Sequence, residues 1–296
     1  MRGFINRNDA IPSAAIFLSG GGSNAEKLLE NLRSSKAPAW KAAVLVTDAP
    51  EKSRARELSR LFDVPIVEHD IKKFYLARGE SRISLFTENG RRIREEWTNE
   101  LRKLLAGYRI DFGILAGFVP LSNITSDFPC LNVHPGDLTV ERGGRRILAG
   151  LHTIPVEAAI LNGFKTMRSS VIVAQAYTGV GGEMDSGPVL GISEEVPINF
   201  QGHSLESLKQ IADARPDKRP PGGYGDILEN IAKLNQDKLK ENGDWVVFPP
   251  SVNDFAAGNF ASEENDSLYY NDTASGFKKV KTVIYGKNNS RKPLFI

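Results

Sequence analysis

The feature that most constrains this chain is a short apolar segment that leads directly into a glycine-rich turn. Residues 14–18, Ala-Ala-Ile-Phe-Leu, have the length and continuous hydrophobicity of a buried strand. Residues 19–24 then read Ser-Gly-Gly-Gly-Ser-Asn, and apolar side chains recur at helical spacing from Ala25 to Leu32. Strand, glycine loop and helix in this order are typical of the opening unit of an α/β sheet.

The same alternation continues through the first half of the chain. Further strands are predicted at 42–46, 64–67, 112–116 and 131–133. Helices are predicted at 53–62 and 93–105. The buried face of the second helix is expected to carry Ile93, Trp97, Leu101 and Leu104. Strands separated by helices favour a parallel sheet covered on both faces, so the predicted fold class is α/β with a doubly wound, mostly parallel sheet.

The pattern changes from about residue 170. Two strands at 171–174 and 189–192 are joined by the loop 178–188 without an intervening helix, which predicts an antiparallel edge. The Arg-, Pro- and Gly-rich segment 215–225 is the strongest candidate for a mobile loop. After it, Asp226 is predicted to cap a helix that has Glu229 at its third position. The buried stripe expected for that helix is Ile227, Ile231 and Leu234.

One catalytic domain is predicted over residues 12–249, followed by a C-terminal extension over 250–296 that packs on the same domain. Within the extension, alternation of side-chain character predicts a strand pair at 268–270 and 280–285. The polar residues 287–292 are expected to fray.

Composition argues against several kinds of partner. Among 296 residues, 38 Lys and Arg stand against 36 Asp and Glu, and the net charge of +2 does not call for a nucleic acid. The single cysteine, Cys130, cannot form an intramolecular disulfide, and no Cys/His cluster has zinc spacing, so we expect no metal and a cytoplasmic setting. No run of about 18 apolar residues occurs, so no membrane span is expected.

The glycine loop has more than one interpretation. Backbone N–H groups at a helix N-terminus, approached closely because glycine lacks a side chain, suit a phosphate or another anion. The spacing Gly20-x-Gly22-x-x-Ala25 also satisfies the dinucleotide fingerprint, in which Asp48 would bind a ribose hydroxyl. The structural alternative is a tight turn capped by a polar side chain, Ser23 or Asn24.

A second group of polar residues lies at the end of the predicted strand 131–133. Asn132 and His134 are two residues apart, so their side chains point the same way and can converge on one substrate. A Pro-Gly turn follows them directly. Further along, Asp185 places a carboxylate in a glycine-rich loop, where it would by itself more often be a turn residue.

Together these segments resemble the folate-dependent formyltransferase family, most closely its branch that acts on glycinamide ribonucleotide. Four motifs occur in the family's order, at residues 19–24, 115–118, 132–135 and 185–188. Residues 150–153, Gly-Leu-His-Thr, match that branch, and residues 244–249 are similar to its late substrate-binding segment.

The resemblance implies transfer of a formyl group from 10-formyltetrahydrofolate, as cosubstrate and without a metal, to a primary amine. Asn132 would donate a hydrogen bond to the oxyanion of the tetrahedral intermediate, and protonated His134 would stabilise its charge. Asp185 would orient His134 and help to move the proton off the attacking nitrogen.

The resemblance also implies binding residues. Those for the substrate phosphate are Gly21, Gly22, Ser23 and Asn24. Those for the acceptor are Arg94 and Asp244. Those for the folate are Leu115, Ala116, Gly117, Phe118 and Val119. The expected partner is a small phosphorylated amine bound by a monomer or homodimer.

Alternatives stay open at this point. Within the same chemistry, the acceptor would be another amine, such as a nucleotide-linked amino sugar. From other classes, the chain would be an NAD-dependent oxidoreductase or a relative that binds a ligand without turnover. Arg145 and Arg146 either reach over the site to an anionic substrate or form a solvated hairpin tip.

Overall fold

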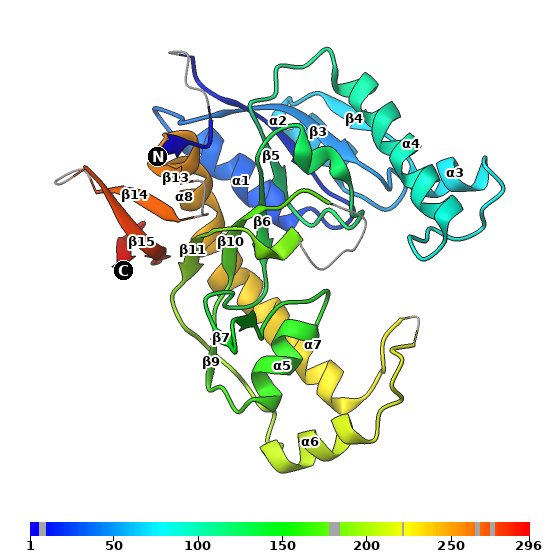
Figure 1. The fold of residues 1–296 in the computed structure, drawn as a ribbon, viewed down its shortest axis with the longest axis vertical. Helices are drawn as coiled ribbons and strands as arrows, with labels where there is room; N and C mark the ends of the chain where they lie inside the picture. The colour runs from blue at the N-terminus through cyan, green and yellow to red at the C-terminus, as the bar shows by residue number, and fades with distance from the viewer. Residues whose placement is uncertain (6–9, 178–183, 221, 264–266, 273–275) are drawn as a thin grey trace. The chain divides into compact units, whose positions relative to one another are not determined.

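The computed structural model describes residues 1–5, 10–177, 184–220, 222–263, 267–272 and 276–296. The chain divides into two compact units, each built from several segments (Figure 1). The first unit comprises Met1–Val133, Ile172–Pro188 and Ser251–Lys279. The second comprises His134–Val171, Val189–Pro250 and Val280–Ile296. The predicted division into a domain at 12–249 and an extension at 250–296 stays a prediction.

Parallel strands form the centre of the first unit. Their order across the sheet is β4-β3-β2-β5-β6, and each neighbouring pair is parallel. The strands are β2 (Ser13–Phe17), β3 (Lys41–Thr47), β4 (Ile66–Glu68), β5 (Phe112–Leu115) and β6 (Cys130–His134), whose last residue opens the second unit. The predicted strands of the first half are confirmed, because continuous apolar runs are what a sheet buried on both faces requires.

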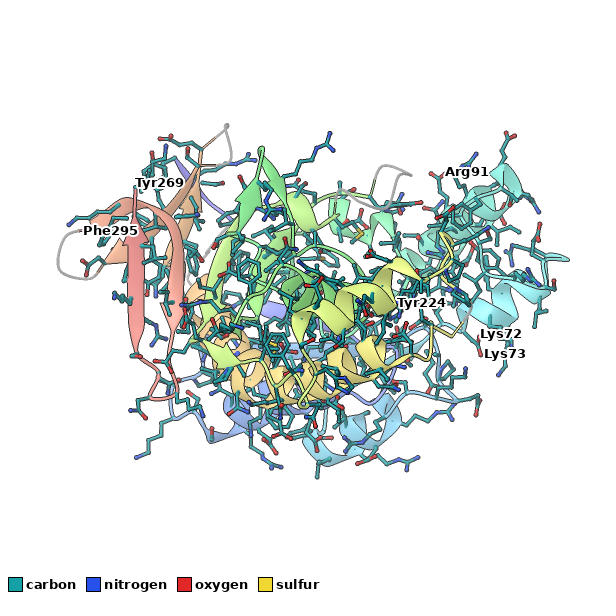
Figure 2. The ribbon with its side chains drawn as sticks, turned by 90° about the horizontal axis from the view of Figure 1, so that it is seen from below. Lys72, Lys73, Arg91, Tyr224, Tyr269 and Phe295 are labelled. Carbon is teal, nitrogen blue, oxygen red and sulfur yellow. The ribbon has the colours of Figure 1, made fainter. Side chains whose placement is uncertain are left out.

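Helices follow these strands in sequence. They are α1 (Ser23–Ser34), α2 (Ala55–Phe62), α3 (Ile71–Leu76) and α4 (Glu88–Leu105), with a short 3-10 turn, η1 (Asn123–Ser126). Helix α4 begins earlier than predicted because the hydroxyl of Thr87 accepts a hydrogen bond from the Gly90 N–H and caps it. Lys72 and Lys73 of α3 and Arg91 of α4 lie exposed on the surface (Figure 2).

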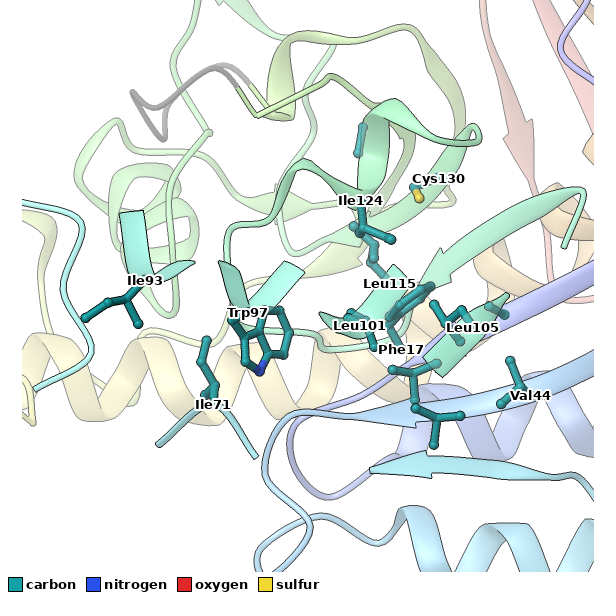
Figure 3. Close-up of a cluster of buried hydrophobic side chains, with 14 of the residues drawn as sticks. Phe17, Val44, Ile71, Ile93, Trp97, Leu101, Leu105, Leu115, Ile124 and Cys130 are labelled. Carbon is teal, nitrogen blue, oxygen red and sulfur yellow. The ribbon is translucent and has the colours of Figure 1, made fainter. Parts of the chain in front are cut away.

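One hydrophobic cluster packs helix α4 against the parallel strands (Figure 3). Ile93, Trp97 and Leu101 are fully buried in it, as predicted. Leu104 is not, since it is 46% exposed and Leu105 takes its place in the core. Both leucines satisfy helical spacing from Leu101, so the sequence pattern does not distinguish them, and the packing of the helix does.

Antiparallel strands complete the first unit. Strand β13 (Phe260–Ser262) pairs with both β1 (Arg2–Gly3) and β14 (Leu268–Asp272), each time antiparallel. The C-terminal part of helix α8 (Trp245–Ala256) also belongs to this unit. So does the C-terminal part of strand β10 (Ser170–Ala174).

The second unit is largely helical around its own hydrophobic core. Its helices are α5 (Ile154–Leu161), α6 (Leu205–Asp213) and α7 (Ile227–Leu239). Short strands form antiparallel pairs, β9 (Thr166–Met167) with β12 (Val196–Pro197) and β7 (Glu141–Arg142) with β8 (Arg145–Arg146). Strand β11 (Val189–Ser193) is parallel to its partner residues in β15 (Gly276–Tyr285).

Helix α7 begins as predicted but faces the core differently. Asp226 caps it by accepting a hydrogen bond from the Glu229 N–H at 2.8 Å. The predicted stripe is wrong at Ile227 and Leu234, which are 46% and 55% exposed, and correct at Ile231. The buried positions are Leu228, Glu229, Ile231, Ala232, Asn235 and Leu239. The stripe is rotated by one residue because tertiary packing selects among apolar positions that all satisfy helical spacing.

The chain ends in a strand. Strand β16 (Arg291–Phe295) pairs antiparallel with β15, from Tyr285 opposite Arg291 to Val280 opposite Phe295. The prediction that residues 287–292 fray is therefore wrong for the last two of them. Pairing with the long strand β15 satisfies backbone groups that side-chain polarity alone does not reveal.

A network of charges holds the residues around 215–225 against helices α5 and α7. Arg215 donates to both carboxylate oxygens of Asp226, at 2.7 and 2.9 Å, and forms an ion pair with Glu157. Arg219 donates to Glu229 at 2.6 Å, and the Tyr224 ring lies 4.0 Å from the Arg215 guanidinium carbon. Arg215, Arg219 and Tyr224, in the segment predicted as a mobile loop, are thus held by several charge-assisted contacts, and residue 221 of that segment lies outside the described residues.

Within the described ranges, none of the helices combines the length and the apolar character that crossing a membrane requires.

Candidate active site

The carboxyl ends of the parallel strands bring three loops together in the first unit. Strands β2, β3 and β5 are neighbours and parallel, so the residues that follow them emerge at one edge of the sheet. Ser19, after β2, donates its backbone N–H to Gly117, after β5, at 3.1 Å. The Val119 N–H in turn donates to the Ser19 hydroxyl at 2.9 Å. The predicted phosphate loop and the predicted folate loop are therefore neighbours, joined through Ser19.

The phosphate loop depends on glycine at one position. Gly22 is the N-cap of helix α1, with a φ of 65° in the left-handed region. A Cβ there would lie 2.9 Å from the Leu58 side chain and 3.0 Å from that of Leu18. Ser23 and Asn24 lie inside the first turn of the helix, so neither occupies the N-cap position, which belongs to Gly22. In the first turn of a helix, the backbone N–H groups have no acceptor within the helix, and this arrangement binds anions.

Asp48 lies behind this loop. The residue is 6% exposed, and its carboxylate accepts a hydrogen bond from the Ser19 hydroxyl at 2.5 Å. Burial raises the pKa of Asp48, against the opposing effects of the Ser19 hydrogen bond and the Arg94 charge. A buried carboxylate that already accepts a hydrogen bond from Ser19 is poorly placed to bind a ribose hydroxyl. This observation argues against the interpretation as an NAD-dependent oxidoreductase.

Arg94 is a buried cation on helix α4. It is 5% exposed, and its Nη1 donates to the Leu121 carbonyl oxygen at 2.5 Å. Its Nε, equally buried, has no hydrogen-bond partner among the described residues. Its guanidinium carbon lies 5.8 Å from the centre of the Tyr75 ring. A buried guanidinium with an unsatisfied donor suits an anionic group of a ligand.

The predicted folate loop continues strand β5. Leu115 and Ala116 are buried, whereas Val119 is exposed. Gly117 has a φ of 82°, a conformation that favours glycine and turns the chain after the strand. Phe118 packs edge-on against Phe17, with ring centres 5.3 Å apart. The loop therefore combines an anchored aromatic residue with an exposed apolar tip.

Asn132 and His134 end strand β6 with one residue between them. His134 is 3% exposed, and its Nε2 lies 2.8 Å from the Leu148 carbonyl oxygen. Asn132 is partly buried and belongs to the first unit, whereas His134 opens the second. The alternation of side chains along a strand directs residues two apart to the same face, as the sequence predicts.

Asp185 lies on a short 3-10 turn, η2 (Met184–Ser186), of the first unit. Met184 anchors the turn because it packs against the core cluster of that unit and its carbonyl oxygen accepts from the Gln175 N–H at 3.0 Å. At Gly187 a Cβ would lie 1.9 Å from the Val173 carbonyl oxygen. The turn that presents Asp185 therefore requires glycine two residues later. Residues 182 and 183 of the predicted glycine-rich loop lie outside the described residues.

Asp244 lies in the second unit at the end of a π-helical turn, η3 (Lys240–Asp244), between α7 and α8. Its carboxylate is buried and accepts from the Ser169 hydroxyl at 2.5 Å. Gly243 allows this approach, since a Cβ there would lie 2.6 Å from the Ser169 oxygen. π-Helical turns inside helices are frequent at functional sites.

Solved structures share this architecture over nearly the whole chain. Phosphoribosylglycinamide formyltransferase from Anaplasma phagocytophilum matches with a TM-score of 0.58 at 16% sequence identity, over 94% of this chain and 100% of that one. The enzyme of the same name from Coxiella burnetii, in complex with CHES, matches with a TM-score of 0.55 at 17% identity, over 88% and 94%. Glycinamide ribonucleotide transformylase 1 from Symbiobacterium toebii matches with 0.51 at 20% identity, over 86% and 92%.

The chain has a formyltransferase-like fold. No protein-family model and no curated protein sequence matches it. The predicted α/β class and mostly parallel sheet are confirmed, and the structure adds that the C-terminal strands β13 with β14 and β15 with β16 pair antiparallel. At these identities the likeness concerns the fold, so the roles of the individual residues stay predictions.

Sequence reasoning does not identify three groups that contact the candidate residues described above. The sequence places Ser19 only in the glycine loop, whereas the structure shows that Ser19 connects this loop to Gly117, Val119 and Asp48. The Leu148 carbonyl gives no signal in the sequence, because every residue carries one. For the contact with Asp244, the signal in the sequence is Ser169, a polar residue shortly before the apolar strand predicted at 171–174.

Proposed function

We propose that this protein transfers a formyl group from 10-formyltetrahydrofolate to a primary amine, and that glycinamide ribonucleotide is the favoured acceptor. This assigns it to one-carbon metabolism and purine biosynthesis in the cytoplasm. The single observation that carries the proposal is the Asn132–His134 pair at the carboxyl end of a central parallel strand, in a fold shared with formyltransferases of that acceptor.

The chemistry requires charge stabilisation at one carbon. The amine nitrogen attacks the formyl carbon, a carbon–nitrogen bond forms, and the carbonyl electrons move to oxygen. The intermediate then collapses, its bond to N10 of the folate breaks, and the proton lost by the amine ends on N10. Asn132 has an amide that donates to the oxyanion, and protonated His134 neutralises its charge. Asp185 accepts the proton during its transfer, and its negative charge stabilises the imidazolium.

The acceptor assignment is supported by the anion-binding features of the first unit. The helix α1 N-terminus, which follows the left-handed Gly22, suits a phosphate. The unsatisfied Nε of Arg94 suits a second anionic group. In the second unit, Asp244 is held by Ser169 and offers a carboxylate oxygen to hydroxyl or amine groups. Leu115–Val119 provide the apolar and backbone contacts proposed for the folate.

The test is a steady-state assay of tetrahydrofolate release with glycinamide ribonucleotide, run beside a panel of other amines that includes nucleotide-linked amino sugars. His134→Ala is expected to lower kcat by about a hundredfold or more, as loss of an oxyanion-stabilising group does. His203→Ala, at an exposed histidine, is the matched control and should leave kcat unchanged. Equal loss in both variants, or no turnover with any amine, contradicts the proposal.

A further inference from the structure

The imidazole of His134 is held by a partner that can only accept. Its Nε2 lies 2.8 Å from the carbonyl oxygen of Leu148, so the hydrogen of this bond must be on Nε2. We propose that Leu148 and Gly136 fix His134 in the Nε2–H tautomer, and that Nδ1 is consequently the ring nitrogen that faces the reaction. The assignment of Nδ1 to the reaction rests on the proposed function, whereas the tautomer does not.

Gly136 makes the contact between Leu148 and His134 sterically possible. A Cβ on Gly136 would lie 2.5 Å from the Leu148 carbonyl oxygen, 3.1 Å from Pro155 Cβ and 3.3 Å from Cδ2 of the His134 ring. The carbonyl therefore occupies space that any other residue at position 136 would fill. The ring edge that carries Nε2 is the same edge that the added methyl group would touch.

The backbone at Gly136 cannot retreat easily to relieve such a clash. Its N–H donates to the His134 carbonyl oxygen at 2.9 Å, and its own carbonyl accepts from the Ser170 hydroxyl at 2.7 Å. Ser170 is fully buried and also accepts from the Leu138 N–H at 3.0 Å. With Gly136 held on both sides, the group that must move is the Leu148 carbonyl.

Leu148 is positioned by the hairpin that precedes it. The strands β7 and β8 turn through Gly143 and Gly144, both with positive φ, which is the signature of a two-residue type I′ turn. The Ile147 N–H then donates to the Val140 carbonyl at 3.3 Å, and the Leu148 side chain is buried in the core of the second unit. The hairpin therefore acts through a backbone carbonyl, whether or not its arginines reach a substrate.

For the proposed chemistry, the contact with Leu148 fixes which N–H of the His134 ring can face the reacting atoms. When His134 is protonated, Nε2–H keeps its bond to Leu148 and the second N–H, on Nδ1, is the one that can face a developing oxyanion. A backbone carbonyl orients the ring without adding a formal charge next to it. Gly136 and Leu148 are thus positioning residues, because they act on the reaction only through His134.

The experiment reads the tautomer directly. Long-range nitrogen–proton NMR spectra of the ¹⁵N-labelled, ligand-free protein at a pH where His134 is neutral will resolve the rings of its four histidines. The His134 signals are identified by their absence in His134→Asn. We expect Nε2 to carry the proton in the wild type. A ring protonated on Nδ1, or an equal mixture of both forms, would overturn the proposal even if the enzyme transfers formyl groups.

A variant links the tautomer to turnover. Gly136→Ala is expected to populate the Nδ1–H form of His134 and to lower kcat about tenfold or more with a smaller change in KM, because the ring shifts relative to the reacting atoms. Gly107→Ala is the control, since nothing lies within 4 Å of a Cβ there. An unchanged tautomer and an unchanged kcat in Gly136→Ala would overturn the role of Gly136. If this variant does not fold, the wild-type spectrum still decides the tautomer.

Discussion

Substitutions of Asp226 separate two contributions to the stability of the second unit, the cap of helix α7 and the ion pair with Arg215. Its carboxylate caps helix α7 through the Glu229 N–H at 2.8 Å and also accepts two hydrogen bonds from Arg215. Asp226→Asn keeps an oxygen that can cap the helix, because asparagine caps about as well as aspartate, but it removes the charge. Asp226→Ala removes both functions. The difference between the two variants isolates the cap.

The magnitudes follow from burial and geometry. Loss of a helix cap costs about 1 kcal/mol. The side chains of Arg215 and Asp226 are 12% and 24% exposed, so the ion pair is worth more than a surface pair although water still screens it. We assign it about 1.5 kcal/mol, which predicts a loss of about 1.5 kcal/mol in Asp226→Asn and about 2.5 kcal/mol in Asp226→Ala.

The pH dependence of this loss has a defined sign. The hydrogen bond from Arg215 lowers the pKa of Asp226 in the folded protein. The stability that the ion pair contributes is therefore fully present above the unfolded pKa of about 4 and is lost as the pH falls through the folded pKa. The difference between the wild type and Asp226→Asn should accordingly shrink at low pH.

Urea unfolding followed by circular dichroism at pH 7 and at pH 3.5 measures these differences. The control is Asp217→Asn, which makes the same change of charge at an exposed position of the same segment and should be neutral. Equal stability of Asp226→Asn and the wild type at pH 7 would refute the value given to the ion pair. Equal stability of the two Asp226 variants would refute the value given to the cap.

Three further predictions concern the first unit. Burial raises the pKa of Asp48 in the folded protein, so the contribution of Asp48 to stability falls as the pH rises from its unfolded pKa through its folded pKa. Asp48→Asn should therefore reduce this loss of stability in unfolding experiments between pH 4 and 8. Gly187→Ala places a Cβ 1.9 Å from the Val173 carbonyl oxygen and should lower kcat on the order of 100-fold by displacing the adjacent acidic turn, whereas Gly107→Ala should not. Gly22→Ala forces a φ of 65° on alanine and should raise the acceptor KM about tenfold without changing the folate KM.

Much of the fold can be predicted from the sequence, because buried parallel strands consist of continuous runs of apolar residues. Residues 14–18 predicted β2 almost to the residue, and Asp226 with Glu229 predicted the start of α7. The buried faces of helices were less accessible. Leu104 and Leu105 both satisfy helical spacing, and only the packing of α4 shows that Leu105 is buried.

The candidate site likewise contains residues that local spacing predicts and contacts that it does not. Asn132 and His134 could be selected because a strand converts a spacing of two into a shared direction. The groups that orient such residues could not be selected in the same way. The contact of His134 with Leu148 uses a backbone carbonyl, and that of Asp48 with Ser19 joins loops that are distant in the chain. Both depend on tertiary structure rather than on local pattern.

The most direct test of the central claim follows the formyl carbon itself. The protein is incubated with 10-formyltetrahydrofolate labelled with ¹³C in the formyl group and with glycinamide ribonucleotide, and the label is followed by NMR. We predict that the label appears in the formamide of the acceptor, at equal amounts with released tetrahydrofolate, and that His134→Ala abolishes this. Label that appears only as free formate, or that stays on the folate, would contradict the assignment of this chain as a formyltransferase.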